Sequence, residues 1–205
     1  MPLTGASGSV RWVGPKRYAA LLRGINVGGR NKLAMSDLRR AFTDDGFERV
    51  GTYIQSGNVV FETTAPQRTL EHRIERLLDD RLETPPVVVV RSHRQLRTVV
   101  EQAPPEFLAQ ADTHLRDCVF LKHPLTSERT MEIVRLRDGV DHAWPGPDVV
   151  YFSRLEAQRT KTLMNKILAA REYRLMTIRN WATTTKVLAL LDGMGGPVPP
   201  VRSAG

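Results

Sequence analysis

The order of the secondary-structure elements predicted from the chain constrains its fold more than any other feature. Strands are predicted where apolar and β-branched residues run together, and helices where apolar residues recur every three or four positions. In the first half, strands are expected over residues 17–23, 49–55, 58–63 and 87–90, and helices over 37–45, after Pro66 and over 93–102. This order is βαββαβ followed by one more helix.

The second half of the chain repeats this order. Its strands are expected over residues 116–122, 140–144, 148–152 and 174–179, and its helices over 127–137, 160–171 and 182–191. The two halves share no obvious sequence, so the repeat is one of elements. This pattern predicts an α+β protein of two tandem ferredoxin-like βαββαβ units, each an antiparallel sheet with helices on one face.

Proline and glycine content predicts where these units begin and end. Pro104 and Pro105 mark a linker, and the proline- and glycine-rich end of the chain predicts disorder. The resulting division is a flexible leader over residues 1–16, a first unit over 17–103, a linker over 104–113, a second unit over 114–192 and a disordered tail over 193–205.

Charge and cysteine content narrow the class of partner and the compartment. The 205 residues carry 30 lysines and arginines against 22 acidic residues, a formal net charge of +8, which suits phosphorylated or polyanionic partners. The single cysteine, Cys118, excludes an intrachain disulfide and is expected to be buried as a small apolar residue. No apolar run is long enough for a membrane span, and residues 1–16 lack the apolar core of a signal peptide. A cytoplasmic protein with no membrane contact is therefore expected.

The known patterns for metal binding and catalysis are not found in the sequence. The five histidines are dispersed without ligand spacing, no serine has the surroundings of a nucleophile elbow, and no close pair of carboxylates forms a motif. No metal or cofactor is therefore expected, and no catalytic residue is identified.

The segment from Arg23 to Lys32, RGINVGGRNK, is the strongest candidate for a binding site. Its glycines free the backbone to turn N–H groups towards an anion, its cations would neutralise charge, and its asparagines can donate amide hydrogens. The residues concerned are the glycines Gly24, Gly28 and Gly29, the cations Arg23, Arg30 and Lys32, and the asparagines Asn26 and Asn31. The loop is not a Walker A motif, because Arg30-Asn31 stands where Lys-Ser/Thr is required. An alternative of equal weight is that the glycines only allow close packing between the two units.

Polar residues around the predicted hairpin form a second candidate group. Tyr53 and Gln55 would meet a ligand lying across the sheet if they share a strand face, with Ser56 and Asn58 beside them. The preferred alternative is that Ser56, Gly57 and Asn58 only make the turn and Tyr53 packs at the sheet edge.

Arg179 and Asn180 precede the last predicted helix and form a third group. A helix N-terminus beside an arginine is a ready site for an anion. An alternative of equal weight is that Asn180 or Thr183 only caps the helix, with Trp181 in the core.

The motifs ALLRGINVGGRNK and TYIQSGNVVF, which lie within residues 20–61, resemble a bacterial family known as domain of unknown function 1697. The stretch TIRNWATTTK, residues 177–186, is similar to a C-terminal motif of the same family. The resemblance extends from about Tyr18 to Leu191 and implies two ferredoxin-like units, but no reaction. Two departures fall in the second unit: residues 159–166 are out of register with the family pattern, and Ala182 replaces an expected polar residue.

Three hypotheses for function follow. The first is a binding module that holds a phosphorylated small molecule or a nucleic-acid backbone at the basic loop. The second is an enzyme that acts on a small anionic substrate and uses the same loop as a phosphate or oxyanion clamp, although no general base is evident. The third is that the motifs are purely structural, at the interface of the two units. The first hypothesis is preferred, the other two remain as alternatives, and the sequence does not indicate an oligomeric state.

Overall fold

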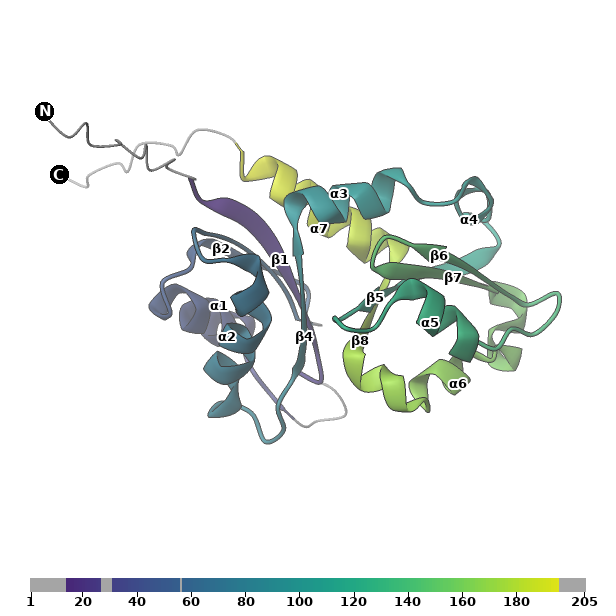
Figure 1. The fold of residues 1–205 in the computed structure, drawn as a ribbon, viewed down its shortest axis with the longest axis horizontal. Coiled ribbons are helices and arrows are strands. Elements are labelled where there is room, and N and C mark those ends of the chain that lie inside the picture. The colour runs from purple at the N-terminus through teal and green to yellow at the C-terminus, as the bar shows by residue number, and fades with distance from the viewer. Residues whose placement is uncertain (1–13, 27–30, 56, 196–205) are drawn as a thin grey trace, which may run out of the picture.

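The chain folds into two four-stranded antiparallel sheets of the same topology (Figure 1). The computed structural model describes residues 14–26, 31–55 and 57–195. The first unit contains β1 (Lys16–Arg23), α1 (Met35–Asp44), β2 (Glu48–Tyr53), β3 (Asn58–Thr63), α2 (Gln67–Asp79), β4 (Val87–Ser92) and α3 (His93–Glu101). Its strands lie in the order β2-β3-β1-β4, the order of a ferredoxin-like unit.

The second unit repeats this arrangement, with shorter helices between its strands. Its elements are α4 (Pro105–Ala109), β5 (His114–Leu121), α5 (Ser127–Ile133), β6 (Asp141–Gly146), β7 (Val149–Leu155), η1 (Glu156–Lys161), α6 (Met164–Leu168), η2 (Arg171–Leu175), β8 (Met176–Asn180) and α7 (Trp181–Gly193). Its strand order, β6-β7-β5-β8, is the first order with each strand replaced by its counterpart. The predicted fold of two ferredoxin-like units is confirmed.

The alternation of side chains along β1 explains how the two units pack. Tyr18, Ala20 and Leu22 point to one face, where they pack with residues of α1 and α2. Ala19 and Leu21 point to the other face and join a core that also contains residues of the second sheet. Because successive strand residues face opposite sides of a sheet, each sheet is buried on both faces.

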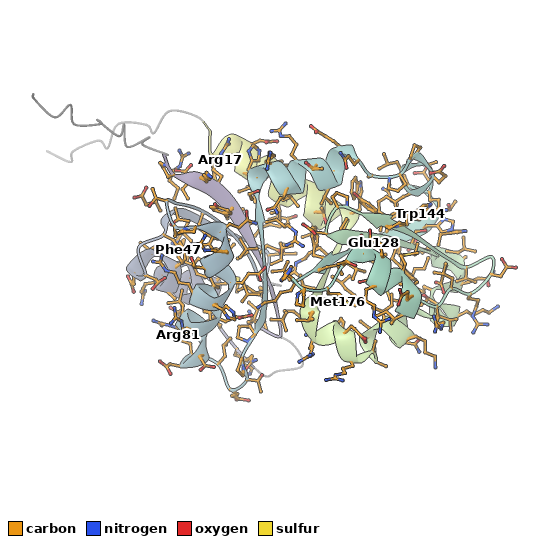
Figure 2. The ribbon with its side chains drawn as sticks, viewed as in Figure 1. Arg17, Phe47, Arg81, Glu128, Trp144 and Met176 are labelled. Atoms are coloured by element: carbon orange, nitrogen blue, oxygen red, sulfur yellow. The ribbon has the colours of Figure 1, made fainter. Side chains whose placement is uncertain are left out.

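The shared core lies between the two sheets, and α3 and α7 close it along one side. Cys118 and Phe120 of β5 and Tyr151 of β7 enter it from the second unit, and Leu96 of α3 and Leu191 of α7 enter it from the helices. Figure 1 shows α3 and α7 lying side by side across both units. Figure 2 places Arg17 beside α7, where its Nη1 donates to the carbonyl oxygen of Leu191 at 2.7 Å.

Several element boundaries differ from the predictions. Helix α1 begins at Met35 with Ala34 as N-cap, so Ser36 is not the cap that the sequence suggested. The helix predicted over residues 160–171 is wrong, because η1, α6 and η2 replace it. The buried carboxylate of Asp141 accepts hydrogen bonds from the Thr162 hydroxyl and the Leu163 N–H, and Thr162 is held in an extended conformation. A contact with a distant strand therefore interrupts the helix.

The predicted linker and tail both contain ordered structure next to the shared core. Phe107 of α4 is fully buried in that core, and so is most of Met194, which follows α7. Residues 1–13 of the predicted leader and 196–205 of the predicted tail lie outside the described residues. Among the helices of the described ranges, none is long and apolar enough to cross a membrane.

Candidate functional site

The loop that follows β1 is held in place by its two asparagines. Both have a positive φ, 53° at Asn26 and 49° at Asn31, which asparagine tolerates better than most residues. The Asn26 amide donates to the carbonyl oxygen of Leu33 and accepts from the Leu33 N–H, at 2.9 and 2.8 Å. The buried Asn31 amide donates to the carbonyl oxygens of Gly24 and Thr84, at 2.7 and 3.0 Å. These side chains close the loop on itself and tie it to the α2–β4 connection.

Other residues predicted for this loop fall into two groups. Gly24 lies in the left-handed region, with φ of 95°, and a Cβ there would meet only ordinary contacts, so its φ and not its packing requires glycine. Lys32 is exposed. Gly28, Gly29 and Arg30 lie outside the described residues.

Arg23, the last residue of β1, presents the most unusual side chain of the loop. It is half-buried, and its guanidinium carbon lies 4.0 Å from the centre of the Tyr173 ring, which η2 of the second unit supplies. The Arg23 Nε is buried and makes no hydrogen bond within the described part of the chain. No ion pair to Arg23 is found among the described residues either. Native proteins seldom leave a buried donor without an acceptor.

A cavity of about 330 Å³ opens beside Arg23. Its lining comes from both units: Leu22, Arg23, Gly24, Ile25, Asn26, Gln55 and Arg179. A second cavity of about 370 Å³ adjoins it, because the two share Asn26 and Gln55, and Lys32 lines this second cavity. The exposed amide of Gln55 therefore stands between the two cavities, with a cation on either side.

Arg179, on β8, joins the second unit to the first. Its Nε donates to Asn58 Oδ1 at 2.6 Å, and its Nη2 donates to the carbonyl oxygens of Leu22 and Gly57 at 2.6 and 3.3 Å. Burial lowers the pKa of Arg179 to about 10, so the guanidinium remains charged at neutral pH. Arg179 thus places a fixed positive charge in the wall of the cavity.

The remaining predicted residues are distributed around this junction. Asn58 is buried, and its amide donates to the carbonyl oxygen of Tyr53. The strand expected to reach Gln55 ends at Tyr53, because Ile54 has a positive φ of 48°. Tyr53 therefore packs against the shared core, whereas Gln55 lies in the turn. Ser56 lies outside the described residues.

Asn180 is the N-cap of α7, since its side chain accepts from the Thr183 N–H at 2.7 Å. It does not line the cavity beside Arg23. Tyr173 was missed in the sequence, where it lies between a predicted helix and a predicted strand. Nothing in the sequence pairs it with Arg23, which is distant along the chain.

The side chains around the first cavity are suited to holding an anion. Guanidinium and carboxamide groups line it, and the described residues of its lining include neither a carboxylate nor an imidazole. Elsewhere in the described ranges, no three side chains of His, Cys, Asp and Glu are grouped so that they could hold a metal ion.

Comparison with known proteins places this chain beside others of unestablished function. The model of a family described as "Protein of unknown function (DUF1697)" matches residues 16–151. A solved structure, that of the conserved bacterial protein SP0830 from Streptococcus pneumoniae, is 29% identical and has a TM-score of 0.73; the match covers 86% of this chain and 99% of that one. No curated protein matches the chain.

Proposed function

The chain belongs to the DUF1697 family, whose function is unknown, and on that premise we propose that it is a binding module for a small phosphorylated ligand. The ligand lies in the cavity between the two units, with its anionic group at the guanidinium of Arg23. The basic loop recognised in the sequence supplies this residue.

The state of Arg23 is the observation that carries the proposal. A half-buried guanidinium loses part of its hydration, and a protein normally compensates with hydrogen bonds or a carboxylate. In the described part of the chain, the Arg23 guanidinium has the face of Tyr173 as its partner, and its Nε has no acceptor. Stacking fixes the plane of the guanidinium and leaves its edge for a bidentate contact with phosphate oxygens.

The neighbouring groups support a small ligand rather than a long one. Gln55 and Lys32 extend the polar lining into the adjoining cavity, and the two cavities together have the size of an ordinary small-molecule site. Asn26 and Asn31 contribute less directly, because their amides are occupied in shaping the loop.

An enzyme with the same loop as a clamp is less well supported. General acid–base catalysis requires a titratable group within hydrogen-bond reach of the substrate, and the polar side chains that described residues contribute to the first cavity are amides and guanidinium groups. The structural hypothesis suits Arg179 and Asn180, which join the units and cap a helix. It leaves Arg23 unexplained.

Isothermal titration calorimetry with glycerol 3-phosphate tests the proposal. The variants are Arg23→Met, which removes the charge, and Arg40→Met, a matched control on α1 whose side chain is 74% exposed. Loss of a charge-assisted contact is expected to weaken binding about tenfold or more. Arg40→Met is expected to bind as the wild type does.

Two results would argue against the proposal. Equal affinity of the wild type and Arg23→Met for glycerol 3-phosphate would mean that the ligand binds at another site. Absence of binding, together with a loss of stability in Arg23→Met, would favour a packing role for the loop. Titration with single-stranded RNA at two salt concentrations tests the alternative that the ligand is a nucleic-acid backbone. RNA binding that requires Arg23 and weakens steeply with salt would support that alternative instead.

A further inference from the structure

The junction between the two units contains two counterpart arginines. Arg91 lies on β4 opposite Ala19 of β1, and Arg179 lies on β8 opposite Cys118 of β5. Since β4 and β8 occupy the same place in their sheets, the two residues are structural equivalents. Both are buried, and both point across the junction into the other unit.

The two arginines bind equivalent carbonyl oxygens. Arg179 Nη2 donates to Leu22 and Gly57, and Arg91 Nη2 donates to Leu121 and Asp148. In each unit these two residues are themselves paired, because the Leu22 N–H donates to Gly57 and the Leu121 N–H donates to Asp148. Each unit therefore inserts an arginine at the same point of the other.

The residue that follows each leucine is also a cation, and it too reaches the opposite unit. After Leu22 comes Arg23, which lies on Tyr173 of η2. After Leu121 comes Lys122, whose Nζ forms ion pairs with Glu75 and, at 3.9 Å, with Glu71, both on α2. The cavity beside Arg23 thus has a counterpart, a cleft of about 510 Å³ beside Lys122.

The two sites differ in how their charge is balanced. At the Lys122 site, Lys122 pairs with Glu71 and Glu75, and the carboxylates that act on Arg91 are Asp148 and then Glu71. Arg68 is a third cation of the described lining, and His72 and His123 complete its titratable groups. The glutamates are fixed in place, since Glu71 accepts from the Val90 N–H at 3.0 Å and Glu75 from the Val88 N–H at 3.4 Å.

Among the described residues, the lining of the Arg23 site carries two positive charges, of Arg23 and Arg179, and no negative one. Both sites are open cavities, but the second unit presents the ring of Tyr173 to Arg23, whereas α2 presents two carboxylates to Lys122. At the Lys122 site, two negative charges of the chain itself thus lie beside cations of the junction.

We infer that the ligand of the Arg23 site is a doubly charged anion of the phosphate monoester class, which takes the place that Glu71 and Glu75 take at Lys122. This inference rests on the proposed function and narrows it. A phosphate monoester carries a charge of about −1.5 to −2 near neutral pH, whereas a phosphodiester, such as a nucleic-acid backbone, carries one charge per phosphate. The monoester supplies two negative charges beside the two guanidinium groups, as Glu71 and Glu75 do beside Lys122, and the diester supplies one.

A series of small anions, titrated into the full chain at one ionic strength and neutral pH, tests the class of ligand. Methyl phosphate and sulfate are the doubly charged probes, and dimethyl phosphate and acetate the singly charged ones. The doubly charged probes are expected to bind about tenfold more tightly, and Arg23→Met is expected to remove this preference. If dimethyl phosphate binds as well as methyl phosphate, the inference is wrong while the proposed function stands. If none of the probes binds, the proposed function itself fails.

The counterpart site provides a converse test. In Glu71→Gln/Glu75→Gln, Lys122 loses both of its carboxylates and Arg91 keeps Asp148 alone, so the number of methyl phosphate ions bound per chain is expected to rise from one to two. Adding Lys122→Met is expected to return it to one. A folded Glu71→Gln/Glu75→Gln variant that still binds one ion would contradict the equivalence of the two sites. The single variant Glu75→Gln provides the same comparison if the double variant does not fold.

Discussion

Arg179 is a buried cation whose hydrogen bonds cross from one unit to the other. Among the described residues of the first unit, it donates to the amide oxygen of Asn58 and the carbonyl oxygens of Leu22 and Gly57, which are neutral acceptors. Hydrogen bonds from a charged donor are among the stronger ones in proteins, and their loss leaves buried acceptors unsatisfied. The residue is therefore expected to matter for stability as well as for the charge of the cavity.

Arg179→Met is expected to lower the free energy of unfolding by about 2–4 kcal/mol, because it leaves buried oxygens of the first unit without donors. Urea denaturation followed by circular dichroism measures this change. Arg40→Met, an exposed control, is expected to stay within about 0.5 kcal/mol of the wild type. A comparable, small effect in both variants would mean that Arg179 does not hold the units together.

Tyr173 is expected to affect ligand binding through Arg23 alone. Tyr173→Ala removes the ring on which the guanidinium lies, a contact worth about 0.5–1 kcal/mol at a partly exposed site, so affinity for methyl phosphate is expected to fall about two- to fivefold. Tyr173→Phe retains the ring and is expected to bind nearly as the wild type does. Calorimetry of both variants measures these affinities. An equal loss of affinity in Tyr173→Ala and Tyr173→Phe would show that the Tyr173 hydroxyl matters, and not the ring.

The N-terminus of helix α7 combines features of an anion site with contacts that have a structural role. Its N-terminus follows Arg179 directly, a combination that favours anions in general. The Asn180 side chain, however, accepts from the Thr183 N–H, and the buried Thr183, Thr184 and Val187 pack the helix into the fold. The capping alternative from the sequence describes this end of the helix.

Asn180→Ala is expected to destabilise the protein by about 1 kcal/mol, the usual cost of losing an N-cap, while affinity for methyl phosphate stays unchanged. Asn180→Asp restores an acceptor and is expected to recover the stability. Thermal unfolding and calorimetry on the same samples provide both readings. A marked loss of affinity in Asn180→Ala would bring the helix end back into the binding site.

The elements that could be predicted from the sequence are those whose causes are local. Periodic apolar residues such as Leu70, Ile74 and Leu78 define α2, and the run of valines that begins at Val87 defines β4. The break in the helix predicted over residues 160–171 depends on Asp141, which is distant along the chain. It could not be found from local spacing.

The site follows the same rule. Arg23, Gln55 and Arg179 were recognisable as polar residues in motifs, and the structure brings them to one cavity. Tyr173 and the counterpart cation Lys122 could not be recognised in the sequence, because their contacts form only when the two units pack together. Arg91, which follows the run of valines, could have been noticed in the sequence. A charged residue in a buried strand requires partners, so its position indicates a contact with another part of the fold.

The whole molecule is built around a core that belongs to both units. Cys118 is fully buried there beside residues from both sheets and from α3 and α7. Burial raises the pKa of its thiol to about 12 from a model-peptide value of 9.0. The folded state therefore keeps the thiol neutral, and this contribution to stability is present below about pH 9 and decreases as pH rises towards 12, because the unfolded chain releases the proton first.

Cys118 should consequently report the opening of the whole molecule. Its alkylation by iodoacetamide is expected to be slow in the native state at mildly alkaline pH, and to accelerate with urea in parallel with the loss of circular dichroism from both units. Core substitutions in either unit, Leu21→Ala or Phe120→Ala, are expected to shift this single transition. Two separate transitions, or alkylation before the first unit unfolds, would mean that the units unfold independently.

The measurement that tests the central claim most directly is a nuclear magnetic resonance titration of the full chain with methyl phosphate, observing the Nε–H groups of the arginines and the side-chain amides. The account predicts that the Arg23 Nε–H and the Gln55 amide shift together and saturate at one equivalent, while the Arg91 Nε–H, in the cleft beside Lys122, stays in place. Shifts confined to exposed arginines such as Arg40, with Arg23 unmoved, would contradict it.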